Sequence, residues 1–294
     1  MKIVVSGASG LVGSALVPHL RGQGHDVLRL VRRATQAPDE VYWDPAAGVI
    51  DDGALRGVEA AVNLSGAGVG DHRWTDSYQR TILRSRVDTT DLLSRALTRL
   101  DPLPRVLVSA SGMDYYADTR EEVTEESPRG SGFLSEVTRD WEAAAEPARH
   151  AGVIVSHPRS GLILSPHGGV LKRLMPLIRL GLGGPVGSGR QWWSWITLHD
   201  HVRALTRLLD ADLPGPVNLT APVPVEQRAF MAVLARAAHR PAVLPVPGLA
   251  VRVGIGGFAE AVLASHRVVP QRLLDAGFTF DQPDLAVAAP ALMR

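Results

Sequence analysis

The fold is decided near the start of the chain, by the stretch Lys2-Ile3-Val4-Val5-Ser6-Gly7-Ala8-Ser9-Gly10-Leu11-Val12-Gly13. Its β-branched run predicts a strand over residues 2–6, and the apolar spacing after the glycines predicts a helix over 11–22. Glycines at this three-residue spacing let the backbone turn tightly and approach a pyrophosphate, while the helix start presents free N–H groups and partial positive charge. The stretch therefore predicts a dinucleotide-binding loop, and a plain turn between strand and helix is the minor alternative. We expect the cofactor to lie against Gly7, Ala8, Ser9, Gly10, Leu11, Val12 and Gly13.

Outward from this stretch, short β-branched runs alternate with longer helical patterns up to about residue 160. The alternation is typical of βαβ units, and it predicts an α/β fold with a Rossmann-type, doubly wound parallel sheet. The predicted strands are 27–31, 60–63, 106–109 and 153–155. The predicted long helices are 76–100 and 133–149.

The pattern changes after residue 160. A segment rich in glycine and proline, 168–189, surrounds a short apolar helix over 170–180. A helix over 202–209 and a strand over 216–219 follow, and the strand can rejoin the sheet. From 226 onward the chain is predicted to form a helical lobe. We therefore expect a nucleotide-binding part made of 1–160 with 195–222, and a smaller, mostly helical substrate-binding lobe made of 161–194 with 223–294.

Composition excludes several classes of function. The 294-residue chain has a formal net charge of +1, so no overall field favours nucleic acid or an anionic membrane. Cysteine is absent, which excludes disulfides, thiolate nucleophiles and cysteine-ligated zinc. No apolar run has the length of a signal peptide or a transmembrane helix. We expect a cytoplasmic monomer or homodimer whose partner is a small-molecule substrate.

The end of the second predicted strand indicates which dinucleotide binds. NAD sites place an acidic residue there for the ribose hydroxyls, but this strand ends Val31-Arg32-Arg33, with no carboxylate before Asp39. Two guanidinium groups suit the 2′-phosphate of NADP(H), which they can hold with charge-assisted hydrogen bonds. Arg32 and Arg33 therefore favour NADP(H), and two ordinary surface arginines are the alternative.

Further motifs give the chain a family resemblance over nearly its whole length. The glycine loop is generic, but a longer set resembles the extended short-chain dehydrogenase/reductases, and in particular the epimerase-like branch of nucleoside-diphosphate-sugar epimerases or dehydratases without an assigned substrate. The set comprises Trp43-Asp44-Pro45, Asn63 to Gly68, Arg73-Trp74, Ser85-Arg86-Val87, Tyr115-Tyr116, Gly181 to Pro185, Gly187 to Gln191 with Trp195-Ile196, Val217 to Pro222, Pro270 to Leu274 and Ala276-Gly277-Phe278.

The resemblance implies further cofactor contacts. Leu64, Ser65 and Gly66 would lie against the cofactor at the end of the strand over 60–63. Arg86, on the long helix, would offer a cation to the phosphates, and an arginine pointing inward from this helix needs an anionic partner in any case. An exposed helix arginine is the alternative. Pro158 would flank the nicotinamide, next to Arg159.

The catalytic pair of the resembling family is missing. Short-chain dehydrogenases use Tyr-x-x-x-Lys on a helix, where the lysine lowers the tyrosine pKa and the tyrosine exchanges a proton with the substrate oxygen. The only lysines here are Lys2 and Lys172, and neither follows a tyrosine at that spacing. Phe133 and Val137 stand where the pair is expected.

The best remaining candidates follow the strand over 106–109, at the carboxyl edge where ligands bind in such folds. Ser111 could hydrogen-bond a substrate carbonyl or hydroxyl, and Tyr116 could donate the proton. The alternative is structural, because paired tyrosines after a strand often fill the space between sheet and loop.

Two other side-chain groups have a structural and a functional interpretation. His199-Asp200-His201 lacks a third ligand at useful spacing, so we expect no metal site and assign Asp200 to the cap or first turn of a helix. Trp192, Trp193 and Trp195 could either pack between the two parts or line the substrate site.

The sequence thus predicts an NADP(H)-dependent oxidoreductase or epimerase that acts on a small polar substrate, with a nucleotide sugar as one candidate, by hydride transfer. The alternative from another class is an NADPH-binding sensor or binding module without turnover. The missing Tyr-Lys pair is the reason to keep that alternative.

Overall fold

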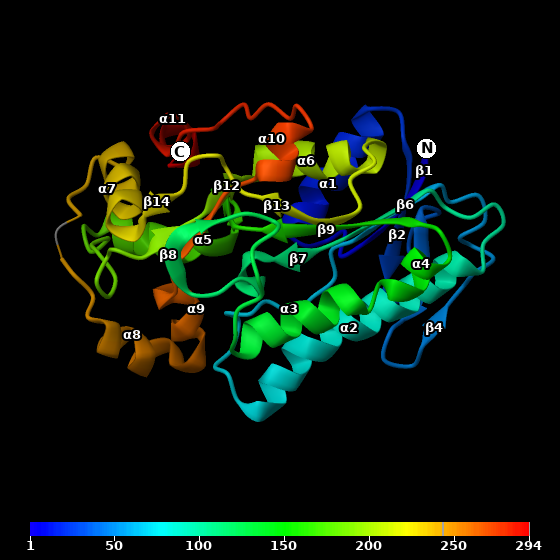
Figure 1. Cartoon of the computed structure of the whole chain (residues 1–294), viewed down its shortest axis with the longest axis horizontal. Coiled ribbons are helices and arrows are strands. Elements are labelled where there is room, and N and C mark those ends of the chain that lie inside the picture. Colours follow the sequence, from blue (N-terminus) through cyan, green and yellow to red (C-terminus); the bar gives the residue numbers. More distant parts are fainter. Residues whose placement is uncertain (243, 294) are drawn as a thin grey trace.

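A parallel sheet forms the centre of the structure, a computed structural model that describes residues 1–242 and 244–293 (Figure 1). The strand order is β13-β9-β6-β5-β1-β2-β3-β4, with short β7 also paired to β9, and only β3 and β4 pair antiparallel. The strands are β1 Lys2–Ser6, β2 Asp26–Val31, β3 Glu40–Asp44, β4 Val49–Ile50, β5 Ala60–Asn63, β6 Val106–Ser109, β7 Ser111–Gly112, β9 Ile154–Ser160 and β13 Gly215–Leu219. The chain runs to one side from β1 to β2 and β3, then returns to the other side at β5, which confirms the doubly wound topology.

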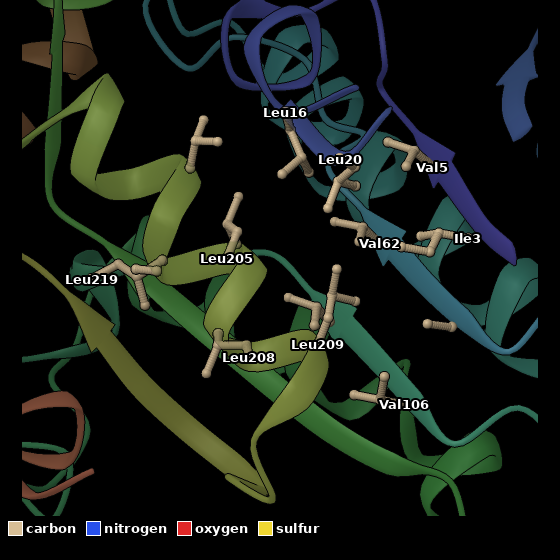
Figure 2. Packing of buried hydrophobic residues seen from close by; sticks show 14 of the residues in the cluster. Ile3, Val5, Leu16, Leu20, Val62, Val106, Leu205, Leu208, Leu209 and Leu219 are labelled. Carbon is tan, nitrogen blue, oxygen red and sulfur yellow. The ribbon is translucent and has the colours of Figure 1, made fainter. Parts of the chain in front are cut away.

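Helices cover both faces of this sheet, as a buried parallel sheet requires (Figure 1). One face carries α1 Leu11–Gly22 and α6 Leu198–Asp210, and the other carries α2 Asp76–Thr98, α3 Phe133–Ala143 and α4 Glu146–His150. Figure 2 shows the core on the first face, where Leu16 and Leu20 of α1 and Leu205 and Leu208 of α6 meet strand residues such as Val62. The central strands of this sheet are therefore buried between two layers of helices.

A second part of the chain lies beyond the β13 edge. Its helices are α5 Gly169–Arg179, α7 Gln227–Ala237, α8 Gly248–Ile255, α9 Ala259–Leu263 and α11 Leu285–Leu292, with the 3₁₀ turn η2 Gly256–Phe258. The 3₁₀ turn η1 Met113–Tyr115 directly follows β7, and α10 Gln271–Asp275 packs Leu273 into the core between the central sheet and α6. Three two-stranded sheets join them: β10 Leu162–Ser165 with β12 Trp195–Thr197, β11 Trp192–Trp193 with β14 Val225–Glu226, and β8 Thr119–Val123 with β15 His266–Val268. The part is mostly helical, with its own apolar core around Phe230 and Trp195. Across the described residues, no helix has the length and apolar character needed to span a membrane.

Most predicted elements are present, and three differ. The helix predicted over 133–149 is two helices, because Pro147 has no N–H to donate and its ring would clash with the preceding turn. The strand predicted over 153–155 extends to Ser160, so β9 carries Pro158 and Arg159 to the sheet edge. The helix predicted over 202–209 starts at Leu198, since the Thr197 side chain caps it by accepting from the Asp200 N–H at 3.3 Å.

Candidate cofactor and active site

The glycine loop joins β1 to α1 at the point where the strand order reverses. Among the described residues, no side chain caps α1 and no acid lies in its first turn, whereas the Thr75 side chain caps α2. The loop closes on itself through the Gly10 N–H, which donates to the Gly7 carbonyl at 3.0 Å, and Ser9 and Gly10 are exposed. The partial positive charge of α1 is therefore left for an anion from outside the helix.

At two positions of the loop, close backbone contacts leave no room for a Cβ atom and require glycine. Gly7 has φ of 67°, and a Cβ on it would come within 2.7 Å of the Leu64 carbonyl carbon. A Cβ on Gly13 would come within 2.3 Å of the Gly7 carbonyl oxygen. The loops after β1 and β5 thus approach each other to backbone contact, and larger residues cannot occupy these positions without displacing the chain.

A chain of buried hydrogen bonds holds these loops from below. Ser6, at the end of β1, donates to Asn63 at the end of β5. Asn63 donates onward to Thr90 of α2 at 2.7 Å, and the Trp141 indole of α3 donates to the same hydroxyl at 3.0 Å. The Ser65 hydroxyl donates to Ser6 at 3.0 Å. These hydrogen bonds connect the strand ends to the helices on one face of the sheet. Among the residues that make them, Ser65 alone is one that the sequence predicts to contact the cofactor.

Arg86 points inward from α2 beneath the loop after β5. Its guanidinium donates to the carbonyls of Ala67 and Ile82, each at 3.0 Å, and lies 4.9 Å from the centre of the Trp141 ring. Within the described part of the chain it forms no ion pair, and burial lowers the pKa of Arg86 to about 10. Gly66 lies against this guanidinium, because a Cβ on Gly66 would be 3.2 Å from the Arg86 Cζ atom. A buried guanidinium without a carboxylate partner fits an anionic ligand.

The two arginines after β2 have different environments. Arg33 makes a bidentate ion pair with Glu40 of β3 at 2.6 and 2.8 Å, and this pair lowers the pKa of Glu40 to about 2. Asp39, the nearest other acid, is bound by Arg29 at 2.6 Å. Arg32 is exposed and makes no hydrogen bond or ion pair with any residue that the structure describes. Local cations therefore neutralise both acids, while the Arg32 charge stays available.

Ser111 lies at the carboxyl edge of the sheet, in β7, next to Arg159 of β9 in register. Its hydroxyl donates to Oε1 of Glu142, from the last turn of α3, at 2.6 Å. Arg159 holds the same carboxylate from below, through Nε to Oε1 and Nη2 to Oε2, both at 2.8 Å. The Ser111 side chain is thus oriented by a buried ion pair, and nothing in the sequence spacing pointed to Glu142.

Tyr116 is held inside the protein. The residue is 2% exposed, its hydroxyl donates to Oδ1 of Asn218 in β13 at 2.8 Å, and it accepts from Arg159 at 3.0 Å. Burial raises the pKa of Tyr116 to about 12. Tyr115 packs edge-on against it, with the Arg159 guanidinium 3.4 Å from the Tyr115 ring centre. The Tyr116 hydroxyl therefore has protein partners both as a donor and as an acceptor.

The remaining predicted site residues have clear positions. Leu64 directly follows β5 beside Gly7, and Pro158 is buried in β9, opposite Val217 of β13.

Asp200 lies in the first turn of α6, where its carboxylate accepts from Arg203 and from the N–H groups of residues 281 and 282. One oxygen or nitrogen from each of three side chains lies within 4.8 Å of the other two: His199, Asp200 and Asp281. Arg203 forms ion pairs with both of these carboxylates, so a cationic side chain already occupies this position. Trp193 and Trp195 are buried in the core of the second part, so they pack rather than line an open site.

Fold and site together define a dinucleotide-binding α/β protein: a doubly wound parallel sheet with an uncapped, glycine-rich helix start at its switch point. Comparison with known proteins makes the class narrower. The model of the NAD dependent epimerase/dehydratase family matches residues 3–219, and the chain belongs to that family. A second model, of a domain of unknown function (DUF1731), matches residues 246–292.

Relatives cover the whole length of the chain. "Epimerase family protein Mb2239" of Mycobacterium bovis is 43% identical over 281 residues, which are 95% of this chain and 93% of that protein. The solved structure of human epimerase family protein SDR39U1 (isoform 2) with NADPH has a TM-score of 0.91 at 32% identity, covering 100% of this chain and 99% of that one. A nucleoside-diphosphate sugar epimerase from Corynebacterium glutamicum has a TM-score of 0.83 at 32% identity, covering 100% of this chain and 58% of that one. These matches confirm the resemblance and the predicted fold class.

Proposed function

We propose that this protein binds NADP(H) across the carboxyl edge of its sheet, with the pyrophosphate at the start of α1. The observation that carries the proposal is the uncapped N-terminus of α1, enclosed by Gly7 and Gly13 at backbone contact with their neighbours. Arg86 supports it as a buried cation facing the same loops. The NADPH bound to human SDR39U1, a relative of similar length, agrees with this choice of cofactor.

The preference for NADP(H) over NAD(H) rests on the residues after β2. An acid that could accept from the ribose hydroxyls must be free, but Arg29 binds Asp39 and Arg33 binds Glu40. Arg32 has no partner among the residues that the structure describes, so its guanidinium can bind the 2′-phosphate. Arg33 contributes positive charge from a position fixed by Glu40.

We further propose a small polar substrate, with a nucleotide sugar as the first candidate because one relative is a nucleoside-diphosphate sugar epimerase. It would lie between the nucleotide-binding part, 1–160 with 195–222, and the lobe formed by 161–194 with 223–294. A bound nicotinamide supplies or takes up the hydride, and the protein supplies geometry and the proton path. Ser111, which is 5% exposed and donates to Glu142, is our candidate to meet a substrate oxygen with its remaining lone pairs, whereas the Tyr116 hydroxyl both donates to Asn218 and accepts from Arg159.

A second candidate is an NADPH-binding protein without turnover. The observation that favours it is the burial of Tyr116 together with the absence of a lysine between Lys2 and Lys172. In that protein the cofactor loop would be used for sensing or assembly, and Ser111 would have a structural role only.

One experiment tests binding and turnover separately. Purified protein is titrated with NADPH and NADH by cofactor fluorescence, and bound NADPH is then offered nucleotide-sugar, ketone and aldehyde acceptors. We expect tighter binding of NADPH than NADH and hydride transfer to at least one acceptor class. Equal or tighter binding of NADH would contradict the assignment of Arg32. NADPH binding without transfer to any acceptor would instead establish the second candidate.

A further inference from the structure

The polar side chains around Ser111 form one connected path at the sheet edge. Ser111 donates to Glu142 at 2.6 Å, Arg159 grips both Glu142 oxygens at 2.8 Å, and Arg159 continues to the Tyr116 hydroxyl at 3.0 Å. These side chains come from β7, α3, β9 and the turn after η1. Three of these four side chains come from α3 and from the strands packed against it, and α3 itself carries Phe133 and Val137 where the family would place its catalytic tyrosine and lysine.

The direction of the first hydrogen bond decides what Ser111 can do. Arg159 donates to both oxygens of Glu142, and the single hydroxyl hydrogen of Ser111 is directed to Oε1 of the same carboxyl group. Only the lone pairs of Ser111 Oγ then remain for a ligand. In this arrangement Ser111 can accept from a substrate hydroxyl, and it can donate to a substrate carbonyl only when Glu142 carries the proton and the hydrogen bond between the two side chains is reversed.

We propose that Ser111 and Glu142 form a proton relay that stands in for the missing Tyr-Lys pair, with Glu142 as the acceptor that acts through Ser111. The inference rests on the proposed function, since it concerns the proton that accompanies hydride transfer. When a substrate alcohol is oxidised, its C–H electron pair leaves as the hydride that NADP⁺ takes up. The O–H proton passes to Ser111 Oγ, and the Ser111 proton passes to Glu142 Oε1. Carbonyl reduction is the reverse of each step.

The surroundings of Glu142 suit this role. Its side chain is 14% exposed while that of Arg159 is 3% exposed, so the proton can leave Glu142 for solvent and the guanidinium stays in place. Other titratable groups close to the pair are Tyr116, which contacts Arg159, and His157, which lies two residues before Arg159 on β9. Tyr116 is committed to Asn218, so it does not compete for the substrate proton. The resting hydrogen-bond pattern thus favours the alcohol-oxidising direction.

Two carbonyl probes separate proton delivery from hydride transfer. Reduction of 4-nitrobenzaldehyde gives a strongly basic alkoxide that needs a proton, whereas reduction of 9,10-phenanthrenequinone gives a weakly basic hydroquinone anion that does not. With NADPH bound, Ser111→Ala is expected to lower kcat for the aldehyde about 100-fold, the low end of what a positioned proton donor contributes. Its KM for the aldehyde, its NADPH affinity and its rate with the quinone are expected to stay close to wild type.

Glu142→Gln is expected to show the same pattern, with Glu142→Asp restoring part of the aldehyde rate. Because Glu142→Gln leaves Arg159 without its partner and can unfold the protein, Ser111→Ala, which keeps that ion pair, is the decisive variant. Glu146→Gln, in the surface pair with Arg149, is the matched control and should behave as wild type.

A second readout needs no turnover. Infrared difference spectra between wild type and Glu142→Gln identify the carboxylate stretch of Glu142, and Ser111→Ala is expected to shift that band because it removes a hydrogen bond to the carboxylate. An unshifted band would overturn the relay.

The remaining outcomes of the rate measurements are also decisive. Equal slowing of both probes in Ser111→Ala, or reduction of the quinone but not the aldehyde by wild type, would overturn the relay alone. A wild type that reduces neither probe nor any other acceptor would overturn the proposed function, and the relay with it.

Discussion

The two ends of the proposed cofactor site are built in different ways. At the phosphate end, the proposed site consists of seven consecutive residues, 7–13. It depends on backbone atoms and on glycines that leave room for close backbone approach. The other end, which we call the packed end, is built from side chains of separate elements that are joined by hydrogen bonds: Ser111, Glu142, Arg159, Tyr116 and Asn218. A site of the first kind is determined by local sterics, and a site of the second kind by the packing of the whole domain. Substitutions at the two ends should therefore fail in different ways, the first by losing binding and the second by losing stability.

The largest effect is expected at the packed end. Arg159→Met removes the guanidinium and leaves the mostly buried Glu142 carboxylate without its partner, which should lower the free energy of unfolding by about 3–5 kcal/mol. Urea denaturation followed by circular dichroism measures this loss. Arg149→Met breaks a solvent-exposed pair with Glu146 on the same face and should leave the denaturation midpoint unchanged. Similar losses in both variants would show that the buried pair has no special structural importance.

At the phosphate end, Gly13→Ala should affect binding most. Its Cβ would lie 2.3 Å from the Gly7 carbonyl oxygen, so the loop must move. The N–H groups of the loop would then no longer point toward the pyrophosphate. Loss of one charge-assisted hydrogen bond, about 1.5–3 kcal/mol, corresponds to roughly ten- to hundredfold weaker NADPH binding. Gly22→Ala in the same helix, with nothing within 4 Å of the new Cβ, is the control and should bind as wild type. Unchanged affinity of Gly13→Ala would remove the steric argument for the loop.

The same difference explains what the sequence could predict. Spacing alone identified Gly7, Gly10 and Gly13, because the constraint acts between neighbours in the chain and repeats a known local geometry. It also placed β1, α1, β5 and β6 at their observed bounds. Ser111 was proposed as a site residue from its place after β6, but its hydrogen-bond partner Glu142 was not predicted, because residues 31 apart meet only once α3 packs against β7 and β9.

Tyr116 shows the limit most clearly. Its position after a strand predicts both a proton donor and a packing residue, and the choice depends on whether Asn218, 102 residues later, reaches its hydroxyl. That contact forms only because β13 returns to pair with β9. Arg33 is similar, since its pairing with Glu40 depends on β3 lying beside β2, and β3 itself was not predicted.

A pH series tests whether the interior beside the packed end, where α6 meets the end of β9, excludes solvent. His201 is fully buried in α6, bonded through Nε2 to the Ser160 hydroxyl at 2.8 Å, and burial lowers the pKa of His201 to about 3. Between that value and the unfolded pKa of about 6.5, only the unfolded chain binds the proton, so stability falls as pH falls, by about 1.4 kcal/mol per pH unit. His201→Gln should flatten the dependence of unfolding free energy on pH by that amount. A comparison at pH 7.5, where histidine is neutral in both states, measures the lost packing separately. An identical slope in both proteins would mean that His201 is open to water.

The smallest effect is expected at the exposed adenosine end, with Arg32→Ala. An exposed ion pair contributes up to about 1 kcal/mol, so NADPH affinity should fall by at most about fivefold while NADH affinity stays constant. Because the contact is in solvent, the difference should shrink as salt is added. Arg56→Ala, on an exposed turn, controls for loss of one positive charge elsewhere on the surface. Equal weakening of NADPH and NADH binding would place Arg32 outside the 2′-phosphate site. The selectivity would then have to come from Arg33, whose guanidinium must leave Glu40, or share it, before it can bind the phosphate.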